Sequence, residues 1–110
     1  MMSNHKRKLS IAEIKKIAAM LSCQTRLRIV RIFWETNRGL DAAAISRRII
    51  RKWRIVLPMK DIARNLKLLN RAGIVKSKHS WGMREFFWLD RGLIRSFLSG
   101  LFGQNRNLTP

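Results

Sequence analysis

The stretch that decides the fold is PMKDIARNLKLLNRAGIV, residues 58–75. Within it Ile62, Leu66 and Leu69 recur at the spacing of three and four residues that places side chains on one face of a helix. The proline at its start suits a first helical turn, where a missing N–H is no loss, and the glycine near its end suits a helix terminus. We therefore predict an amphipathic helix over residues 58–72.

Four basic side chains share the opposite side of this helix. They are Lys60, Arg64, Lys67 and Arg71. At about 100° per residue all four lie within about 40° of the direction opposite the apolar face, with no acidic residue between them. A stripe of this kind is an ordinary solvated face on many helices, so its meaning depends on the elements around it.

The neighbouring segments give the stripe a specific context. Asp41 can cap a preceding helix that runs to about Trp53. Residues 74–79 and 84–89 are rich in Ile, Val, Phe and Trp and flank a Gly-containing turn, which predicts a β-hairpin. A helix, a turn, a second helix and a hairpin are the parts of a winged helix-turn-helix, whose second helix enters the DNA major groove.

The rest of the chain adds three more helices. Ser10 and Glu13 have capping-box spacing, so the first helix begins at about residue 11. A second, largely apolar helix follows a break near residues 22–25 and stops at Asn37-Arg38-Gly39. The last runs over about residues 92–102. We expect a mainly α fold of about five helices with a two-stranded wing.

One domain fits the length of 110 residues. The expected organisation is a flexible basic arm over residues 1–9, a winged-helix domain over residues 10–103 and a flexible tail over residues 104–110.

The charge balance indicates a polyanionic partner. The chain has 24 Lys and Arg against 6 Asp and Glu, for a formal net charge of +18, and a sequence pI near 12.0. Nucleic acid is the commonest partner for such a chain, because neutralising phosphates releases counterions. Double-stranded DNA is therefore the predicted partner.

The cysteine content and the hydrophobic pattern indicate where in the cell the protein is expected. Cys23 is the only cysteine, so one chain can form neither a disulfide nor a multi-thiolate metal site. We see no secretory signal pattern and no stretch of the roughly 18 charge-free residues that a membrane helix needs. The expected location is the cytoplasm, with association to the nucleoid if the source is prokaryotic, and no membrane partner is expected.

The predicted DNA contacts on the helix over residues 58–72 divide by position. The residues are Lys60, Asp61, Arg64, Asn65, Lys67 and Arg71. The N-terminal half usually meets base edges, so Arg64 is assigned to guanine and Asn65 to adenine. Asn65 lies near the apolar face, and a role as a boundary residue is about equally favoured. Asp61 accepts from cytosine or complements the helix dipole. Lys67 and Arg71 are assigned to phosphates.

Two further basic groups flank this helix. The group predicted to hold the DNA backbone is Arg47, Arg48, Arg51, Lys52 and Arg54. The group on the wing, over residues 74–89, is Lys76, Lys78, His79 and Arg84. A basic wing tip can enter the adjacent minor groove and read its width. Trp81, at the turn, either belongs to this DNA-contacting wing tip or packs back on the hairpin.

Two motifs resemble those of ArsR-like winged-helix repressors. Residues 21–34, LSCQTRLRIVRIFW, are similar to the helix that reads L-x-x-x-T-R-L-x-I-L in that family. Residues 62–75, IARNLKLLNRAGIV, resemble its recognition helix, which ends L-x-x-L-x-x-A-G-L-V. The resemblance covers roughly residues 10–100, and Ala72-Gly73-Ile74-Val75 is its most specific part, although related winged-helix families share it.

The resemblance implies a homodimer that regulates transcription from a pseudo-palindromic site. The first and last helices would form the dimer interface, although packing within one subunit explains part of the same apolar pattern. The implied interface residues are Ile14, Ile17, Leu21, Leu93, Ile94, Phe97, Leu98 and Leu101.

The chain departs from this family in two ways. Metal-sensing members carry paired cysteines or clusters of His, Asp and Glu, whereas Cys23, His5 and His79 are scattered here, so neither a metal nor another cofactor is expected. The stretch over residues 50–57 is also longer than the family's usual turn.

Two other classes of function remain open. An enzyme would need clustered acids, bases or nucleophiles, and the six acidic residues are dispersed, so no catalytic residue is predicted. A protein that binds DNA or RNA without sequence preference, or organises chromatin, could use the same fold and the same charge. A membrane-surface role would need a free apolar helix face.

Overall fold

The computed structural model describes residues 8–103, so the predicted tail and most of the predicted arm lie outside the described part. One boundary was wrong. Leu9, assigned to the flexible arm, is only 6% exposed and belongs to the hydrophobic core. The packed part of the chain thus begins before the first helix.

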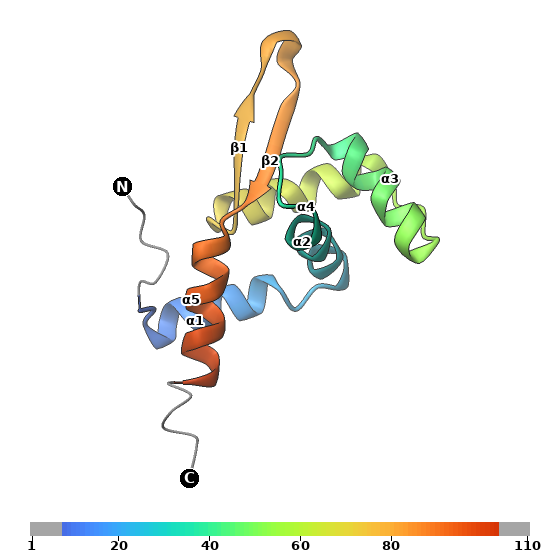
Figure 1. Ribbon diagram of the computed structural model, residues 1–110. Helices are drawn as coiled ribbons and strands as arrows, with labels where there is room; N and C mark the ends of the chain where they lie inside the picture. Colours follow the sequence, from blue (N-terminus) through green and yellow to red (C-terminus); the bar gives the residue numbers. More distant parts are fainter. Residues whose placement is uncertain (1–7, 104–110) are drawn as a thin grey trace.

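Within residues 8–103 the chain forms five α-helices and one two-stranded antiparallel sheet (Figure 1). The elements in chain order are α1 (Ile11–Met20), α2 (Gln24–Thr36), α3 (Ala42–Trp53), α4 (Met59–Arg71), β1 (Val75–His79), a short 3-10 turn (Trp81–Met83), β2 (Glu85–Leu89) and α5 (Arg91–Phe102). The predicted order and number of helices and strands are confirmed.

Local capping chemistry sets several of these boundaries. The Oγ atom of Ser10 accepts from the Glu13 N–H at 3.1 Å, and the Glu13 carboxylate accepts from the Ser10 N–H at 2.9 Å, which completes the capping box of α1. Asn37 ends α2 in the left-handed conformation, and Asp41 caps α3. Pro58 lies just before α4 rather than in its first turn.

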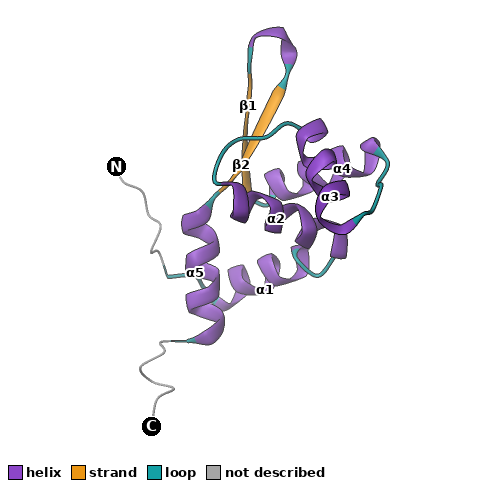
Figure 2. Ribbon diagram, turned by 45° about the vertical axis from the view of Figure 1, so that its right-hand side comes forward, coloured by secondary structure: helices purple, strands orange, loops and turns teal. Residues whose placement is uncertain are grey.

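The core is centred on α2. Ile29 and Phe33 are at most 1% exposed and belong to one cluster with buried side chains from α3 and α4. Figure 2 shows α2 between the α1–α5 pair and the α3–α4 pair. Helices α1 and α5 approach each other closely because position 100, in α5, is a glycine. A Cβ atom there would lie 2.7 Å from Cδ1 of Ile14 in α1. The buried face of α4 belongs to the same core cluster as α2.

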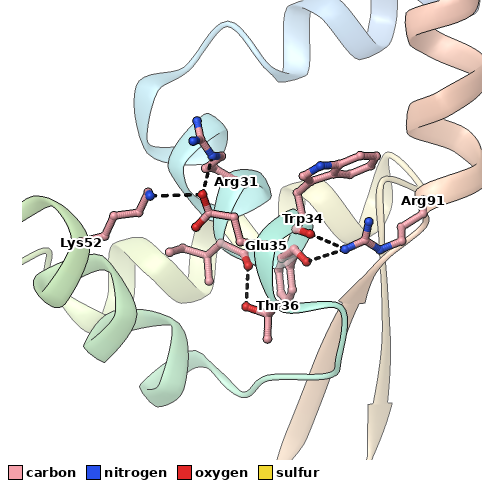
Figure 3. Close-up of polar contacts among 8 residues, drawn as sticks. Arg31, Trp34, Glu35, Thr36, Lys52 and Arg91 are labelled. Atoms are coloured by element: carbon pink, nitrogen blue, oxygen red, sulfur yellow. Dashed lines mark hydrogen bonds and ion pairs between the residues drawn. The ribbon is translucent and has the colours of Figure 1, made fainter.

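An arginine joins the end of α2 to the start of α5. The Arg91 guanidinium donates to the main-chain oxygens of Trp34 and Phe33, the second at 3.4 Å, and lies 4.5 Å from the centre of the Trp34 ring (Figure 3). Carbonyl groups at a helix C-terminus lack partners within the helix, so a cation is favourable there. This contact fixes the Trp34 side chain against α5.

The hairpin projects from the helical body (Figure 1). Its strands pair in a register from Val75 opposite Leu89 to His79 opposite Glu85. A third short segment joins them: Leu40 and Phe87 exchange two main-chain hydrogen bonds of 2.9 Å. The loop between α2 and α3 thereby anchors the base of the hairpin, a contact that the sequence pattern did not indicate.

Candidate nucleic-acid interface

The two faces of α4 differ as the sequence predicts. Ile62, Leu66 and Leu69 are completely buried. The four basic side chains opposite them are all exposed, namely Lys60, Arg64, Lys67 and Arg71. A helix that buries one side fully and presents only cations along the centre of the other can approach a polyanion without rearrangement.

Asp61 lies beside this basic stripe in the first turn of α4. Its Oδ1 atom is 3.2 Å from Nη2 of Arg64, whose side chain is 68% exposed. A carboxylate near a helix N-terminus complements the helix dipole. In this pairing the Arg64 guanidinium lies beside the N-terminal half of α4, the half that usually meets base edges.

Asn65 is corrected from a base-contacting residue to an internal one. It is 7% exposed, and its amide is used twice: Oδ1 accepts from Nη1 of Arg26 at 2.9 Å, and Nδ2 donates to the Asp61 main-chain oxygen at 2.8 Å. A base edge would need both amide groups. Asn65 therefore fixes α4 in place and is removed from the candidate contacts.

Arg26 is the partner that sequence reasoning missed. Besides holding Asn65, its Nε donates to the Met20 main-chain oxygen at 2.6 Å, so one guanidinium links the end of α1, α2 and α4. The spacing of Arg26 from the buried residues of α2 could have indicated this role. Arg26 precedes the buried residues Ile29 and Phe33 by three and seven positions, which places it on the inner face of α2.

The basic group on α3 divides into two sets. Arg47, Arg51 and Arg54 are exposed. Arg54 is the C-cap of α3 and has the left-handed conformation just past the helix. On the helix wheel Arg47 and Arg51 lie within about 40° of each other, on the side away from the buried Ile45 and Ile49. They can contact phosphates together.

Lys52 and Arg48 face elsewhere. The Nζ atom of Lys52 is 3.1 Å from Oε2 of Glu35, which also accepts from Nε of Arg31 at 2.7 Å (Figure 3). Hydrogen bonds from Arg31 and then Lys52 lower the pKa of the Glu35 carboxyl. Lys52 is thus held toward α2, and Arg48 is half-buried. We drop Lys52 from the predicted backbone contacts.

The hairpin presents its predicted cations unequally. Lys76 and Lys78 pair with Trp88 and Phe86, and cross-strand partners share one face of a sheet, so these cations and aromatic rings lie together. Lys76 also approaches an Asp90 carboxylate oxygen at 3.9 Å.

His79 and Arg84 lie nearer the turn, and both face acids. Nε2 of His79 is 3.7 Å from Oε1 of Glu85, and Nε of Arg84 is 3.4 Å from Oδ2 of Asp41, the residue that caps α3. Both side chains remain more than half exposed, so they stay available to an approaching phosphate.

Comparison with known proteins shows the fold. No family model and no curated protein sequence matches the chain. Among solved structures, the ferric uptake regulator of Vibrio cholerae is similar with a TM-score of 0.62 and 21% identity over 74% of this chain. The homodimeric DNA-binding domain of a possible ArsR-family transcriptional regulator from Mycobacterium bovis gives 0.60 and 17% identity, covering 89% of this chain and 83% of that one.

The fold is a winged helix-turn-helix. A possible transcriptional regulator from Methanosarcina mazei shares it, with a TM-score of 0.57 and 14% identity over 98% of this chain and 90% of that one. The chain spans 62% of the length of the Vibrio protein. In this fold α3 and α4 occupy the positions of the two helices of the helix-turn-helix, and the hairpin occupies the position of the wing.

The apolar residues assigned to a dimer interface divide into buried and exposed ones. Ile14, Ile17, Ile94 and Phe97 are all 9% exposed or less and pack within one chain. Their burial accounts for half of the predicted interface without any partner. Leu98 and Leu101 are 41% and 51% exposed and stay candidates, while Leu21 and Leu93 are partly buried.

Three observations concern metal binding, membrane-spanning helices and the thiol of Cys23. Over residues 8–103 no group of three or more His, Cys, Asp and Glu side chains could hold a metal ion. No helix in the described part is long and apolar enough to cross a membrane. Cys23 lies just before α2, where the backbone N–H of Arg26 lowers the pKa of its thiol.

Proposed function

We propose that the chain is a sequence-specific regulator of transcription that binds double-stranded DNA. The recognition helix, α4, would enter the major groove, and the wing would lie at the adjacent minor groove. The observation that carries this proposal is the outer face of α4, where four exposed cations stand opposite a completely buried apolar face. The proposal assigns no catalytic role to any residue.

Base recognition is assigned to the first half of α4. Arg64 can donate in parallel to O6 and N7 of guanine, and its guanidinium lies in the first half of α4, 3.2 Å from Asp61. Lys60 lies one turn earlier on the same face. Lys67 and Arg71 lie further along the helix and are assigned to phosphates.

Phosphate contacts elsewhere would set the position of the protein on the duplex. Arg47, Arg51 and Arg54 supply them from α3 and its end, and the wing supplies Lys76, Lys78, His79 and Arg84. Such contacts raise affinity for every sequence and make it depend strongly on salt.

We also propose a homodimer formed through the exposed end of α5. Leu98, Leu101 and Phe102 are 41%, 51% and 58% exposed on consecutive turns, and apolar side chains grouped this way favour contact with another protein surface. Two copies related by a two-fold axis would present two recognition helices to a pseudo-palindromic site. A regulator of this kind acts where the DNA is, which in a prokaryote is the cytoplasmic nucleoid.

Selection from random duplex DNA at rising salt tests the proposal. We expect enrichment of a two-fold-related motif that survives near-physiological salt, and a complex whose measured mass corresponds to two chains on one duplex. Loss of all binding as salt rises, with no enriched motif, would contradict it.

The net charge favours one second candidate. With a formal charge of +18, and exposed cations on α1 as well as on α3, α4 and the wing, the chain could bind nucleic acid through phosphates alone. A protein of that kind would bind unrelated sequences equally in the same selection and lose affinity steeply with salt. Comparison of duplex DNA with duplex RNA then decides the nucleic acid.

A further inference from the structure

A cavity of 440 Å³ lies on the side of α2 where no residue of α4 or the wing lines it. Its apolar walls are Leu27, Val30 and Trp34 from α2, Trp53 at the end of α3, and Ile94 and Leu98 from α5. A volume of about 300–1,000 Å³ with mainly apolar and aromatic walls is typical of sites for small organic molecules. Neither the base nor the phosphate contacts proposed above use this cavity.

The polar residues that line the cavity are Gln24 and two arginines, so its only charged groups are cations. Arg28 and Arg31 line it and no acidic residue does. Arg31 is occupied by Glu35 at 2.7 Å. Arg28 makes no ion pair with any residue between positions 8 and 103, and its guanidinium lies 5.7 Å from the centre of the Trp53 ring. One arginine that forms no ion pair within the described residues thus lies beside an apolar hollow.

A cation lies near each aromatic wall of the cavity. The Arg91 guanidinium lies 4.5 Å from the centre of the Trp34 ring, and Arg28 and Lys52 lie 5.7 Å and 5.4 Å from the centre of the Trp53 ring. Indole rings are flat and have few rotatable bonds, so ordering them against a ligand costs little conformational entropy. The cavity therefore suits a flat ligand that contacts both indole rings.

We propose that this cavity binds a small aromatic carboxylate. The ring system would contact Trp34, Trp53 and Leu27, and the carboxylate would accept hydrogen bonds from the guanidinium of Arg28. Arginine suits a carboxylate because its planar fork can donate two parallel hydrogen bonds.

The dimer contact proposed above shares Leu98 with the α5 wall of the cavity, but a second copy of this chain fits the cavity itself less well. Leu27 and Trp34 are 50% and 38% exposed at its edge, so an apolar partner surface could reach them. A second copy would, however, bring more Lys and Arg to a hollow whose charged groups are already cations, and like charges that meet at an interface are costly. Charge complementarity favours an anion.

NMR of the free protein with 1-naphthoate as the probe tests the site without any DNA. The result therefore bears on the ligand site and is independent of the proposed DNA interface. We expect saturable shifts of the indole N–H signals of Trp34 and Trp53, while the signal of Trp88 on the wing stays in place. The neutral 1-naphthalenemethanol should bind about tenfold more weakly, because it lacks the charge-assisted hydrogen bonds.

Two arginine variants remove the same charge at different places. Arg28→Gln should weaken naphthoate binding about tenfold, whereas Arg38→Gln, in the exposed loop after α2, should change it less than about twofold. Leu27→Trp fills the mouth of the cavity and should abolish the saturable shifts. Thermal unfolding of each variant checks that it folds. If a variant does not fold, the comparison of 1-naphthoate with 1-naphthalenemethanol on the wild-type chain still tests the proposal.

Four results would overturn the proposal. They are equal weakening by the two arginine variants, equal affinity for the alcohol and the carboxylate, shifts of Trp88 as large as those of Trp34, and the absence of saturable shifts because a second copy covers the cavity. Shifts of the two cavity tryptophans that depend on protein concentration instead of ligand would identify that last case.

Discussion

Replacement of Asn65 by alanine should destabilise the domain and leave base preference unchanged. The side chain is 7% exposed, and it accepts from Arg26 at 2.9 Å and donates to the Asp61 main-chain oxygen at 2.8 Å. One of these hydrogen bonds involves a charged group, so together they contribute about 2 to 3 kcal/mol to the free energy of unfolding. For a domain of this size, that loss lowers the melting temperature by about 10 to 20 °C.

Urea unfolding followed by circular dichroism measures this loss. A double-mutant cycle with Arg26→Met should give a coupling energy of at least about 1 kcal/mol, because the two side chains bond directly. Lys67→Ala, on the exposed face of the same helix, is the matched control and should change stability by less than about 0.5 kcal/mol while it weakens DNA binding. If Asn65→Ala had wild-type stability and an altered preference at one base pair, the internal role of Asn65 would be refuted.

Three further predictions concern other parts of the molecule. Arg64→Ala should relax base preference in a selection experiment, whereas Arg51→Ala should weaken all duplexes about equally; the reverse pattern would contradict the assigned roles. Leu101→Glu should shift sedimentation from dimer to monomer if α5 forms the dimer contact, and an unchanged mass would exclude that contact. Because the pKa of Glu35 is lowered, its ion pairs stabilise the fold above its ordinary pKa of 4.5, and this gain is lost as pH falls through the lowered pKa. The stability difference between wild type and Glu35→Gln should therefore shrink on acidification, and a constant difference would show that the pairs contribute nothing.

The sequence predicted element boundaries well because the signals are local. A capping box at Ser10, a left-handed residue at Asn37 and a cap at Asp41 each act within a few residues of the helix end they define. The apolar spacing of α4 likewise fixes its buried face, and with it the direction of its cations. These properties need no knowledge of the rest of the fold.

Errors arose where a residue's role depends on a distant partner. Asn65 lies beside the apolar face on a helix wheel. Its internal role depends on a hydrogen bond from Arg26, which lies on another helix. Leu9 is buried by elements that the local pattern around it does not reveal. The apolar stripes of α1 and α5 cannot show whether they face each other or a second chain, and the structure shows that Ile14 and Phe97 pack within one chain.

Titration of the isotope-labelled chain with a duplex that carries the selected motif tests the proposed DNA interface most directly. Amide NMR should show the largest shifts along α4, at Lys60, Arg64 and Lys67, with a second set on the wing and little change in α5. Large shifts on α1 or α5 with α4 unaffected would contradict the placement of the recognition helix in the major groove.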